Sequence, residues 1–313
     1  MKLPFTIYDL RFTICRKSVD VSVSNHQSSI VNHKFRGAFT MVELLVVLAI
    51  LGIIAGLAVP ALKNFGRADA MTAATAQLIG DVARARQLAI SQRTTVYMVF
   101  VPTNFWGGPL GTFPNTWWTS LDVVQQNVAT NLCDRQLTGY TFMAYGAVGD
   151  QPGNHLWHYL TPWQSLPDGT FIPLQKFVYP VTVAARDPIT HAITETYPIS
   201  PFYYTNNIPF PTENNIAASI PAPGLPWLPY IAFNYLGQLT FDGQTMAKFH
   251  EYIPLARGNV LAAVNPDTKA FRFAAPQILP QGTPNALDWT NAYDIIDIDP
   301  LTGRATLKQP TLK

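Results

Sequence analysis

The longest apolar stretch of the chain is a run of sixteen residues, 44–59, in which no side chain is polar. With the residues on either side it covers 39–62, which reaches the roughly 20 residues that a membrane-spanning helix needs. Glu43 is the one ionisable residue in this stretch. An acid near a helix end costs less than the roughly 2.5 to 3.5 kcal/mol of a central one, and the many Leu, Ile and Val residues offset it. The pattern predicts a spanning helix with an acid in its first turns.

A second apolar pattern follows this segment. Its residues recur at three- and four-residue steps and form one helical stripe, widened by Ile79 and Leu88: Met71, Leu78, Val82, Ala85 and Ala89. Pro60 lies between the two patterns, and a proline there kinks a helix without having to end it. We therefore predict one helix over about residues 39–92, with a kink at Pro60, whose second half packs its stripe on a soluble domain.

The rest of the chain reads as β structure. Residues 94–101 are rich in β-branched and aromatic side chains and predict the first strand. Further strands are predicted at 140–145, 170–174, 177–183 and 193–197. Segments 261–264 and 270–274 are expected to flank a turn at 265–268. Hairpins are predicted at 230–241 and 293–307. Residues 103–228 show little periodicity and predict a large insertion of irregular β structure. The fold class is α+β, with a long N-terminal helix packed on a C-terminal antiparallel β domain.

Charge is divided unevenly along the chain. Residues 1–38 hold six basic and two acidic residues and have a net charge of +4. Since the whole chain has a net charge of +2, residues 39–313 have a net charge of −2. Lys34 and Arg36 beside the apolar stretch predict a cytoplasmic N-terminus, with the bulk of the chain across the membrane. Residues 1–38 lack the apolar core of a secretory signal peptide. No methionine lies between Met1 and Met41, so we hypothesise that translation starts downstream at an alternative codon.

Glu43 is a functional candidate because an acid inside an apolar helix needs a partner. Cleavage after Ala38 would give Phe39 a free α-amine four residues before Glu43. An amine and a carboxylate that are both poorly hydrated would pair, most usefully between neighbouring copies of the helix, and so set the stagger of an assembly. The alternative is a stray acid at the mouth of an ordinary signal anchor.

The run Ala-Phe-Thr-Met-Val-Glu-Leu-Leu at residues 38–45 resembles the prepilin cleavage and methylation motif of type IV pilins and type II secretion pseudopilins. This resemblance implies cleavage by prepilin peptidase between Ala38 and Phe39, N-methylation of Phe39, Glu43 as the assembly acid and Pro60 as the family's helix proline. Ala38 departs from the usual Gly. A cut after Gly37 would move Glu43 to the sixth mature position, so we prefer the Ala38–Phe39 bond.

The resemblance also implies the organisation of the chain. Residues 1–38 are a cleaved leader, 39–62 a transmembrane assembly helix, 63–93 its amphipathic continuation, and 94–313 a periplasmic β domain with an insertion at about 103–228. The helix end and the closing hairpin are similar to those of the minor pseudopilin H group. The implied function is a minor subunit of a secretion pseudopilus or a pilus, anchored in the inner membrane, with other pilin subunits as partners. The insertion favours a minor subunit because it would crowd a uniformly packed filament.

Other chemistry has weaker support. Asp294, Asp297 and Asp299 suggest a calcium loop, but the terminal Glu of the full pattern is missing. No Gly-Lys phosphate loop and no nucleophile elbow occurs, so we predict neither an enzyme nor a cofactor. Cys133 is the one cysteine left after leader removal, which excludes an internal disulfide.

Two alternatives remain open. The tryptophans at 117, 118, 157, 163 and 227 suit either a core, which we prefer, or a recognition surface of a membrane-anchored carbohydrate-binding domain. A DNA-binding pilin would need clustered cations, and the cations near the C-terminus are scattered in sequence: Arg257, Lys269, Arg272, Arg304, Lys308 and Lys313. A nucleic-acid partner is therefore not expected.

Overall fold

A computed structural model describes residues 40–106, 115–146, 150, 156–186, 190, 193–205, 207–213, 226–280 and 293–309. The chain divides into two compact units, Met1–Gly56 and Leu57–Lys313. We call the second unit the head. Helix α1 (Met41–Gln92) contributes its first residues to the first unit and the rest to the head.

The head contains short helices and strands that follow α1. The helices are α2 (Asn115–Ser120), α3 (Val123–Asn131), the 3-10 helix η1 (Leu132–Arg135) and α4 (Gln175–Val178). The strands up to the middle of the head are β1 (Thr95–Phe100), β2 (Gly139–Tyr145), β3 (Trp157–Tyr159), β4 (Gln164–Ser165), β5 (Thr170–Phe171), β6 (Val181–Arg186), β7 (Ile193–Ile199) and β8 (Tyr203–Thr205). The remaining strands are β9 (Leu228–Phe233), β10 (Leu239–Thr240), β11 (Glu251–Leu261), β12 (Gln277–Pro280), β13 (Tyr293–Ile298) and β14 (Ala305–Lys308).

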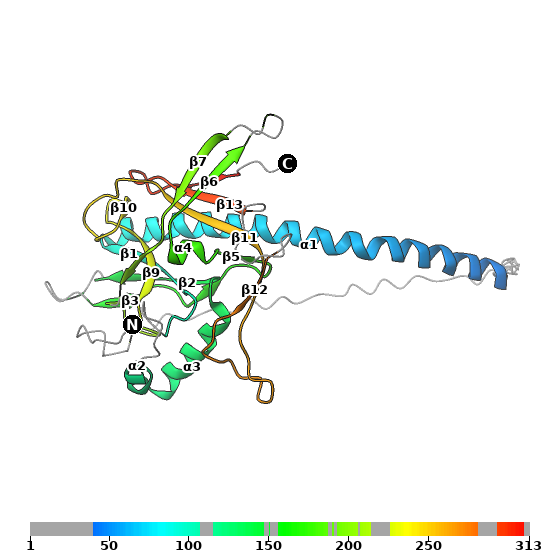
Figure 1. Ribbon diagram of the computed structural model, residues 1–313, viewed down its shortest axis with the longest axis horizontal. Helices are drawn as coiled ribbons and strands as arrows, with labels where there is room; N and C mark the ends of the chain where they lie inside the picture. The colour runs from blue at the N-terminus through cyan, green and yellow to red at the C-terminus, as the bar shows by residue number, and fades with distance from the viewer. Residues whose placement is uncertain are drawn as a thin grey trace, which may run out of the picture. The chain divides into compact units, whose positions relative to one another are not determined.

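Every strand pair that the structure describes is antiparallel, and Figure 1 shows the strands in the head beside the second part of α1. The first sheet has the order β10-β9-β1-β2-β3, with β4 beside β2 and β8 beside β9. The second has the order β12-β11-β13-β14, with β5 beside β11, and β6 and β7 form a separate ribbon. The mixed helix and antiparallel-sheet composition confirms the predicted α+β class.

The main core lies between the second half of α1 and both large sheets. The predicted stripe of Met71, Leu78, Val82, Ala85 and Ala89 is buried, with at most 2% of any of these side chains exposed. It packs with Phe100, Phe142 and Phe233 of the first sheet and with Ile253, Leu255 and Ile296 of the second. The 3.6-residue period therefore located the face of the helix that meets the domain.

A second core lies on the other face of the first sheet. It gathers residues of β1 and β9 with α2, α3 and the loops before and after them, including Phe105, Trp106, Trp117, Leu132 and Phe210. Cys133 lies here with 1% of its surface exposed, and burial raises the pKa of its thiol to about 12. Cys133 is thus a packing residue of this core.

The prediction of irregular β structure throughout 103–228 is wrong for residues 115–120 and 123–135, which are helical. Asp122 begins α3 with a capping box, because its carboxylate accepts the amide of Gln125 at 2.7 Å while the Gln125 side chain accepts the Asp122 amide at 3.2 Å. The Asp-Val-Val-Gln sequence carries this signal without the help of an apolar period. Strand β2, from the same region, pairs directly with β1 in the first sheet.

The strand predicted at 177–183 is wrong in its first part. Residues 175–178 form α4, and β6 begins at Val181. The helical turn buries Phe177 and turns Lys176 inward, where its ammonium group donates to the Ser200 carbonyl at 2.6 Å and pairs with Glu251. Tertiary contacts of this kind override the strand preference of a short aromatic run.

Candidate assembly site at the helix start

The first turn of α1 is closed by Thr40 and Glu43. Thr40 donates its backbone amide and its hydroxyl to the Glu43 Oε2, each at 2.9 Å. The Glu43 amide in turn donates to the Thr40 hydroxyl at 3.2 Å. This reciprocal arrangement is a capping box, in which two backbone donors that the helix leaves unpaired are satisfied by side chains. The carboxylate of Glu43 therefore lies at the N-terminus of the helix, where the helix dipole favours a negative charge.

Sequence reasoning missed Thr40 as a member of this site. The signal was present, because a Thr followed three residues later by Glu, ahead of an apolar run, is the pattern of a capping box. Without this spacing, Glu43 reads only as an unpaired acid in need of a partner. Within one chain the carboxylate of Glu43 already has a hydrogen-bond partner. That partner is Thr40, the residue next to the predicted new N-terminus.

The helix that follows exposes its large apolar side chains. Between Met41 and Ile54 their exposed fractions run from 49% at Val47 to 91% at Met41. Apolar residues around the whole circumference of a helix require an apolar environment on all sides. A single copy of the chain does not provide this for the first described turns of α1.

Helix α1 continues through Pro60, as predicted. The side chain of Pro60 lies outside the described residues, so the kink stays a prediction. Among the residues whose side chains the structure describes, no helix combines the length and apolar character needed to cross a membrane.

A comparison with known protein families finds a match at the start of α1. Residues 34–59 match the family described as the prokaryotic N-terminal methylation motif. The chain carries this methylation motif. The motif is consistent with the type IV pilin and pseudopilin family and supports a pilin-like precursor that is processed by prepilin peptidase and assembles with other pilins. No curated protein and no solved structure matches the chain.

The methylation motif spans all the residues predicted to take part in processing and assembly except Pro60. Ala38 and Phe39 lie within its matched range but outside the described residues, so the scissile bond and the methylation site stay predictions. Glu43 is within the same range and is described. The similarity to the minor pseudopilin H group also stays a prediction.

The three aspartates proposed as weak calcium ligands have different partners. Asp294 accepts a hydrogen bond from the Thr75 hydroxyl at 3.3 Å, and Asp299 caps the following turn by accepting the Thr302 amide at 2.6 Å. Asp297 pairs with His250 Nδ1 at 2.6 Å, and the other ring nitrogen of His250 lies 3.9 Å from Asp299. In the part of the chain that the structure describes, no group of three His, Cys, Asp or Glu residues is arranged to hold a metal ion.

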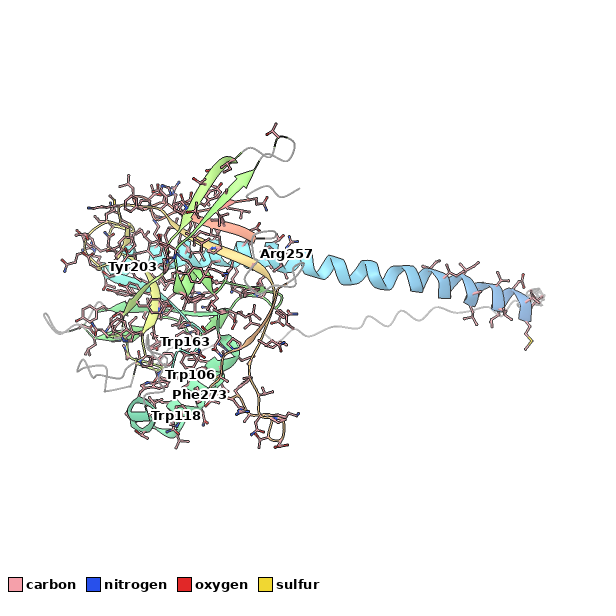
Figure 2. The ribbon with its side chains drawn as sticks, viewed as in Figure 1. Trp106, Trp118, Trp163, Tyr203, Arg257 and Phe273 are labelled. Atoms are coloured by element: carbon pink, nitrogen blue, oxygen red, sulfur yellow. The ribbon has the colours of Figure 1, made fainter. Side chains whose placement is uncertain are left out.

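The tryptophans are mostly part of the second core. Trp106 and Trp117 are 6% and 2% exposed. The ring of Phe273 meets Trp106 at 5.2 Å and Trp118 at 4.8 Å between centroids, both nearly edge-on, and Figure 2 shows these three residues with Trp163 on one side of the head. Edge-to-face rings of this kind stabilise a core. Trp227, 38% exposed, is the more accessible member of the predicted set.

Proposed function

We propose that the chain is a structural subunit of a type II secretion pseudopilus or a type IV pilus. The observation that carries the proposal is the exposed apolar helix that begins at the Thr40–Glu43 cap, inside the matched methylation motif. Exposed apolar surface of this extent on a helix needs lipid before assembly and neighbouring helices after it. The function is mechanical and not catalytic.

In this proposal the leader is cut between Ala38 and Phe39, the new amine is methylated, and the chain stands in the inner membrane with its head in the periplasm. Glu43 then receives the cationic N-terminus of a neighbouring copy. The carboxylate exchanges its bonds with the uncharged donors of Thr40 for a bond with a cationic amine, in which donor and acceptor are both charged. That exchange fixes the axial position of one helix against the next.

A finer proposal is that the chain is a minor pseudopilin. This proposal rests on the bulk of residues 103–228, which would crowd a uniformly packed filament. Much of this region belongs to the head itself, since β2 lies beside β1 in the first sheet. The number of copies per filament, measured by quantitative mass spectrometry, tests the minor role.

Substitution of Glu43 tests the proposed function. We expect Glu43→Ala to leave the chain in the membrane but to remove it from sheared filaments, because the neighbouring amine has no acid to meet. Glu43→Asp is the conservative variant and should keep part of the incorporation. Glu195→Ala, a change of an exposed acid on β7, is the matched control and should not alter incorporation. Full incorporation of Glu43→Ala would refute the proposal.

A further inference from the structure

The paired ends of β11 and β12 form a hairpin, residues 257–280, at one edge of the second sheet. Val260 lies opposite Ile278 in this pair, and both side chains pack against the main core. Because successive side chains of a strand point to opposite faces, the neighbours of these two residues point away from the core. We call that side of the hairpin its outer face. Its five residues are all exposed: Arg257, Asn259, Leu261, Gln277 and Leu279.

The hairpin exposes large apolar side chains close to one another. Their exposed fractions lie between 43% and 47%, and they come from β11, from β12 and from the segment that joins these strands: Leu261, Val264 and Leu279. Exposed apolar residues that gather on one surface mark an interaction site more often than isolated ones do.

Backbone hydrogen bonds hold the turn of the hairpin in one shape. The Asn265 amide donates to the Ala270 carbonyl at 2.8 Å, and the Lys269 amide donates to the Asn265 carbonyl at 2.9 Å. The Arg272 amide donates to the Ala263 carbonyl at 2.8 Å. The side chains of the hairpin are therefore carried on a pre-organised support, which lowers the entropic cost of binding.

The hairpin begins beside the part of α1 that leads to the predicted membrane segment. The Gly258 amide donates to the Gly169 carbonyl at 2.9 Å, and a Cβ on Gly169 would lie 3.9 Å from the Ala70 side chain of α1. The predicted membrane segment ends at Leu62. The eight helical residues from Leu62 to Ala70 span about 12 Å along the helix axis.

The start of β11 lies near the other end of α1. Glu251, its first residue, pairs with Ile298 at the end of β13. The turn after β13 contacts Gly237, and a Cβ on Gly237 would lie 2.7 Å from Ile90 of α1. Twenty residues of helix separate Ile90 from Ala70, about 30 Å. Strand β11 thus runs along the head toward the end from which α1 leads to the predicted membrane segment.

The figures show the same arrangement within the head. In Figure 1, β12 and the end of β11 lie on the side from which the preceding residues of α1 lead away. Figure 2 shows Arg257 on that side. The hairpin is therefore the described pair of strands that faces the bilayer when α1 is held in a membrane.

The distance from Leu62 matches the reach of lipid headgroups. A bilayer is about 40–45 Å thick and its hydrocarbon core about 30 Å, so each headgroup layer is about 5–8 Å deep. A hairpin that begins about 12 Å beyond the hydrocarbon core lies only a few Å above this layer. Charges act over about 8 Å at physiological salt, so the cations of the hairpin are within range of the headgroups.

The sign of the charge selects anionic headgroups. Three exposed cations of the hairpin outnumber the two exposed acids on it and on the adjoining loop: Arg257, Lys269 and Arg272 against Asp168 and Asp267. Residues 39–313 as a whole have a net charge of −2, so this end of the head differs in sign from the rest. Cations next to a membrane helix are attracted to anionic lipids, and a negative surface is repelled by them.

We propose that the outer face of the β11–β12 hairpin binds the anionic lipid headgroups of the membrane that holds α1. This contact rests on the proposed function, in which the subunit stands in the membrane before it assembles. Leu261 and Leu279 enter the headgroup layer, and Arg257 with the cations of the turn binds lipid phosphates. The contact fixes which side of the head faces the bilayer in the unassembled subunit.

Quenching by lipids tests the proposal on the full-length chain in nanodiscs. Leu279→Cys on the outer face is labelled with a fluorescent maleimide, and the lipids carry a spin label on their headgroups. Cys133 is buried and contributes little background. We expect the ratio of quenched to unquenched probe to be about fivefold higher with phosphatidylglycerol present than in pure phosphatidylcholine, the effect of one net cation at an anionic surface.

A second labelled position is the matched control. Leu236→Cys carries the probe at a side chain that is 57% exposed next to Gly237, about 30 Å farther along α1. It should show little quenching with either lipid. Equal quenching at the two positions would overturn the assignment of the hairpin as the membrane-facing side.

Charge variants separate an electrostatic contact from mere proximity. Lys269→Gln combined with Arg272→Gln should reduce quenching of the Leu279→Cys probe in anionic nanodiscs to the level seen in phosphatidylcholine. Lys248→Gln removes an exposed cation from the loop before β11 and should have no effect. High salt should weaken the contact, since it screens exposed charges.

The other outcomes overturn the proposal. Absence of quenching at Leu279→Cys in anionic nanodiscs excludes the lipid contact, and equal quenching in both lipids excludes recognition of lipid charge. A probe that is shielded in native membranes but free in protein-free nanodiscs indicates an acidic protein partner instead.

Failure of the lipid contact and failure of the proposed function are distinguishable. The nanodisc assay needs no filament, so full incorporation of Glu43→Ala into filaments refutes the function and leaves the lipid contact in place. A hairpin that is never quenched, in a chain that still enters filaments, refutes the lipid contact alone. A chain that does not insert into nanodiscs refutes both.

Discussion

The hydroxyl of Thr40 donates to the Glu43 carboxylate at 2.9 Å and accepts the Glu43 amide at 3.2 Å. The acid that we propose to act in assembly is thus also the residue that closes the first turn of α1. Its two tasks follow from its place at the third helical position, where a carboxylate reaches both the cap residue and the space in front of the helix. In a free subunit the cap satisfies the carboxylate, and in the proposed filament the neighbouring amine does so.

We predict that Thr40→Val weakens the start of α1, because it removes the hydroxyl that caps the Glu43 amide. Loss of a Thr cap costs about 1 kcal/mol. Hydrogen exchange of the amides at residues 41–44 in lipid nanodiscs should be faster in the variant. Thr40→Ser keeps the hydroxyl and should exchange like the wild type. Equal protection in Thr40→Val would mean that the cap does not stabilise the helix start.

The head should depend on Leu78 for its stability. This side chain is fully buried between α1 and the sheets, and Leu→Ala changes at such positions cost about 2–5 kcal/mol. We expect Leu78→Ala to lower the midpoint of thermal unfolding measured by tryptophan fluorescence. Leu51→Ala, at a position 55% exposed on the same helix, is the control and should leave the midpoint unchanged. Comparable effects of the two changes would contradict the assigned core.

The buried pair Lys176–Glu251 predicts a non-additive pattern. Burial lowers the pKa of Lys176 and raises the pKa of Glu251, and the attraction between the two groups opposes both shifts. Removing one partner leaves a buried charge unpaired, so Lys176→Met or Glu251→Leu alone should lower the free energy of unfolding by about 3–5 kcal/mol. The double variant should recover much of this loss in urea unfolding. Additive losses would show that the two groups act independently.

Asp242 predicts an acid-sensitive loop between β10 and β11. The Thr245 hydroxyl and the amides of Gln244 and Thr245 bond to its carboxylate and hold its pKa well below the ordinary value. A depressed pKa means that this stabilisation is present above the unfolded pKa of about 3.9 and is lost as the pH falls through the folded value.

The midpoint of thermal unfolding as a function of pH measures this effect. Asp242→Asn should unfold at a lower temperature than the wild type near neutral pH, and the difference should narrow as the pH falls below about 4. A difference that stays constant over this range would exclude a contribution from the Asp242 charge.

The sequence predicted the elements that depend on local pattern. The buried stripe of α1, the strand at β1 and the hairpins β9–β10 and β13–β14 follow from a 3.6-residue period, from β-branched runs and from turn residues. Strand β11 escaped prediction because its Pro254 and Gly258 interrupt the pattern, although it is the strand that joins the second sheet. Its place is fixed by partners far away in sequence, β5 and β13.

The sequence singles out the acid of the candidate site but not the residue that caps it. Glu43 stands out as a single ionisable residue in an apolar run, whereas Thr40 is recognised only when the spacing of three residues is read as helix-capping chemistry. The contact between the turn after β9 and the turn after β13 was not predictable, because the backbone bond from the Leu239 amide to the Pro300 carbonyl joins residues more than sixty positions apart in sequence.

Mass spectrometry of the N-terminal peptide of the protein, isolated from filaments or membranes of its host, tests the central claim most directly. We predict a mature chain that begins with N-methylated Phe39, since only cleavage at that bond places a cationic amine in reach of Glu43 on a neighbouring helix. A chain that keeps residues before Phe39, or that begins at Phe39 without the methyl group and never enters a filament, would contradict the account.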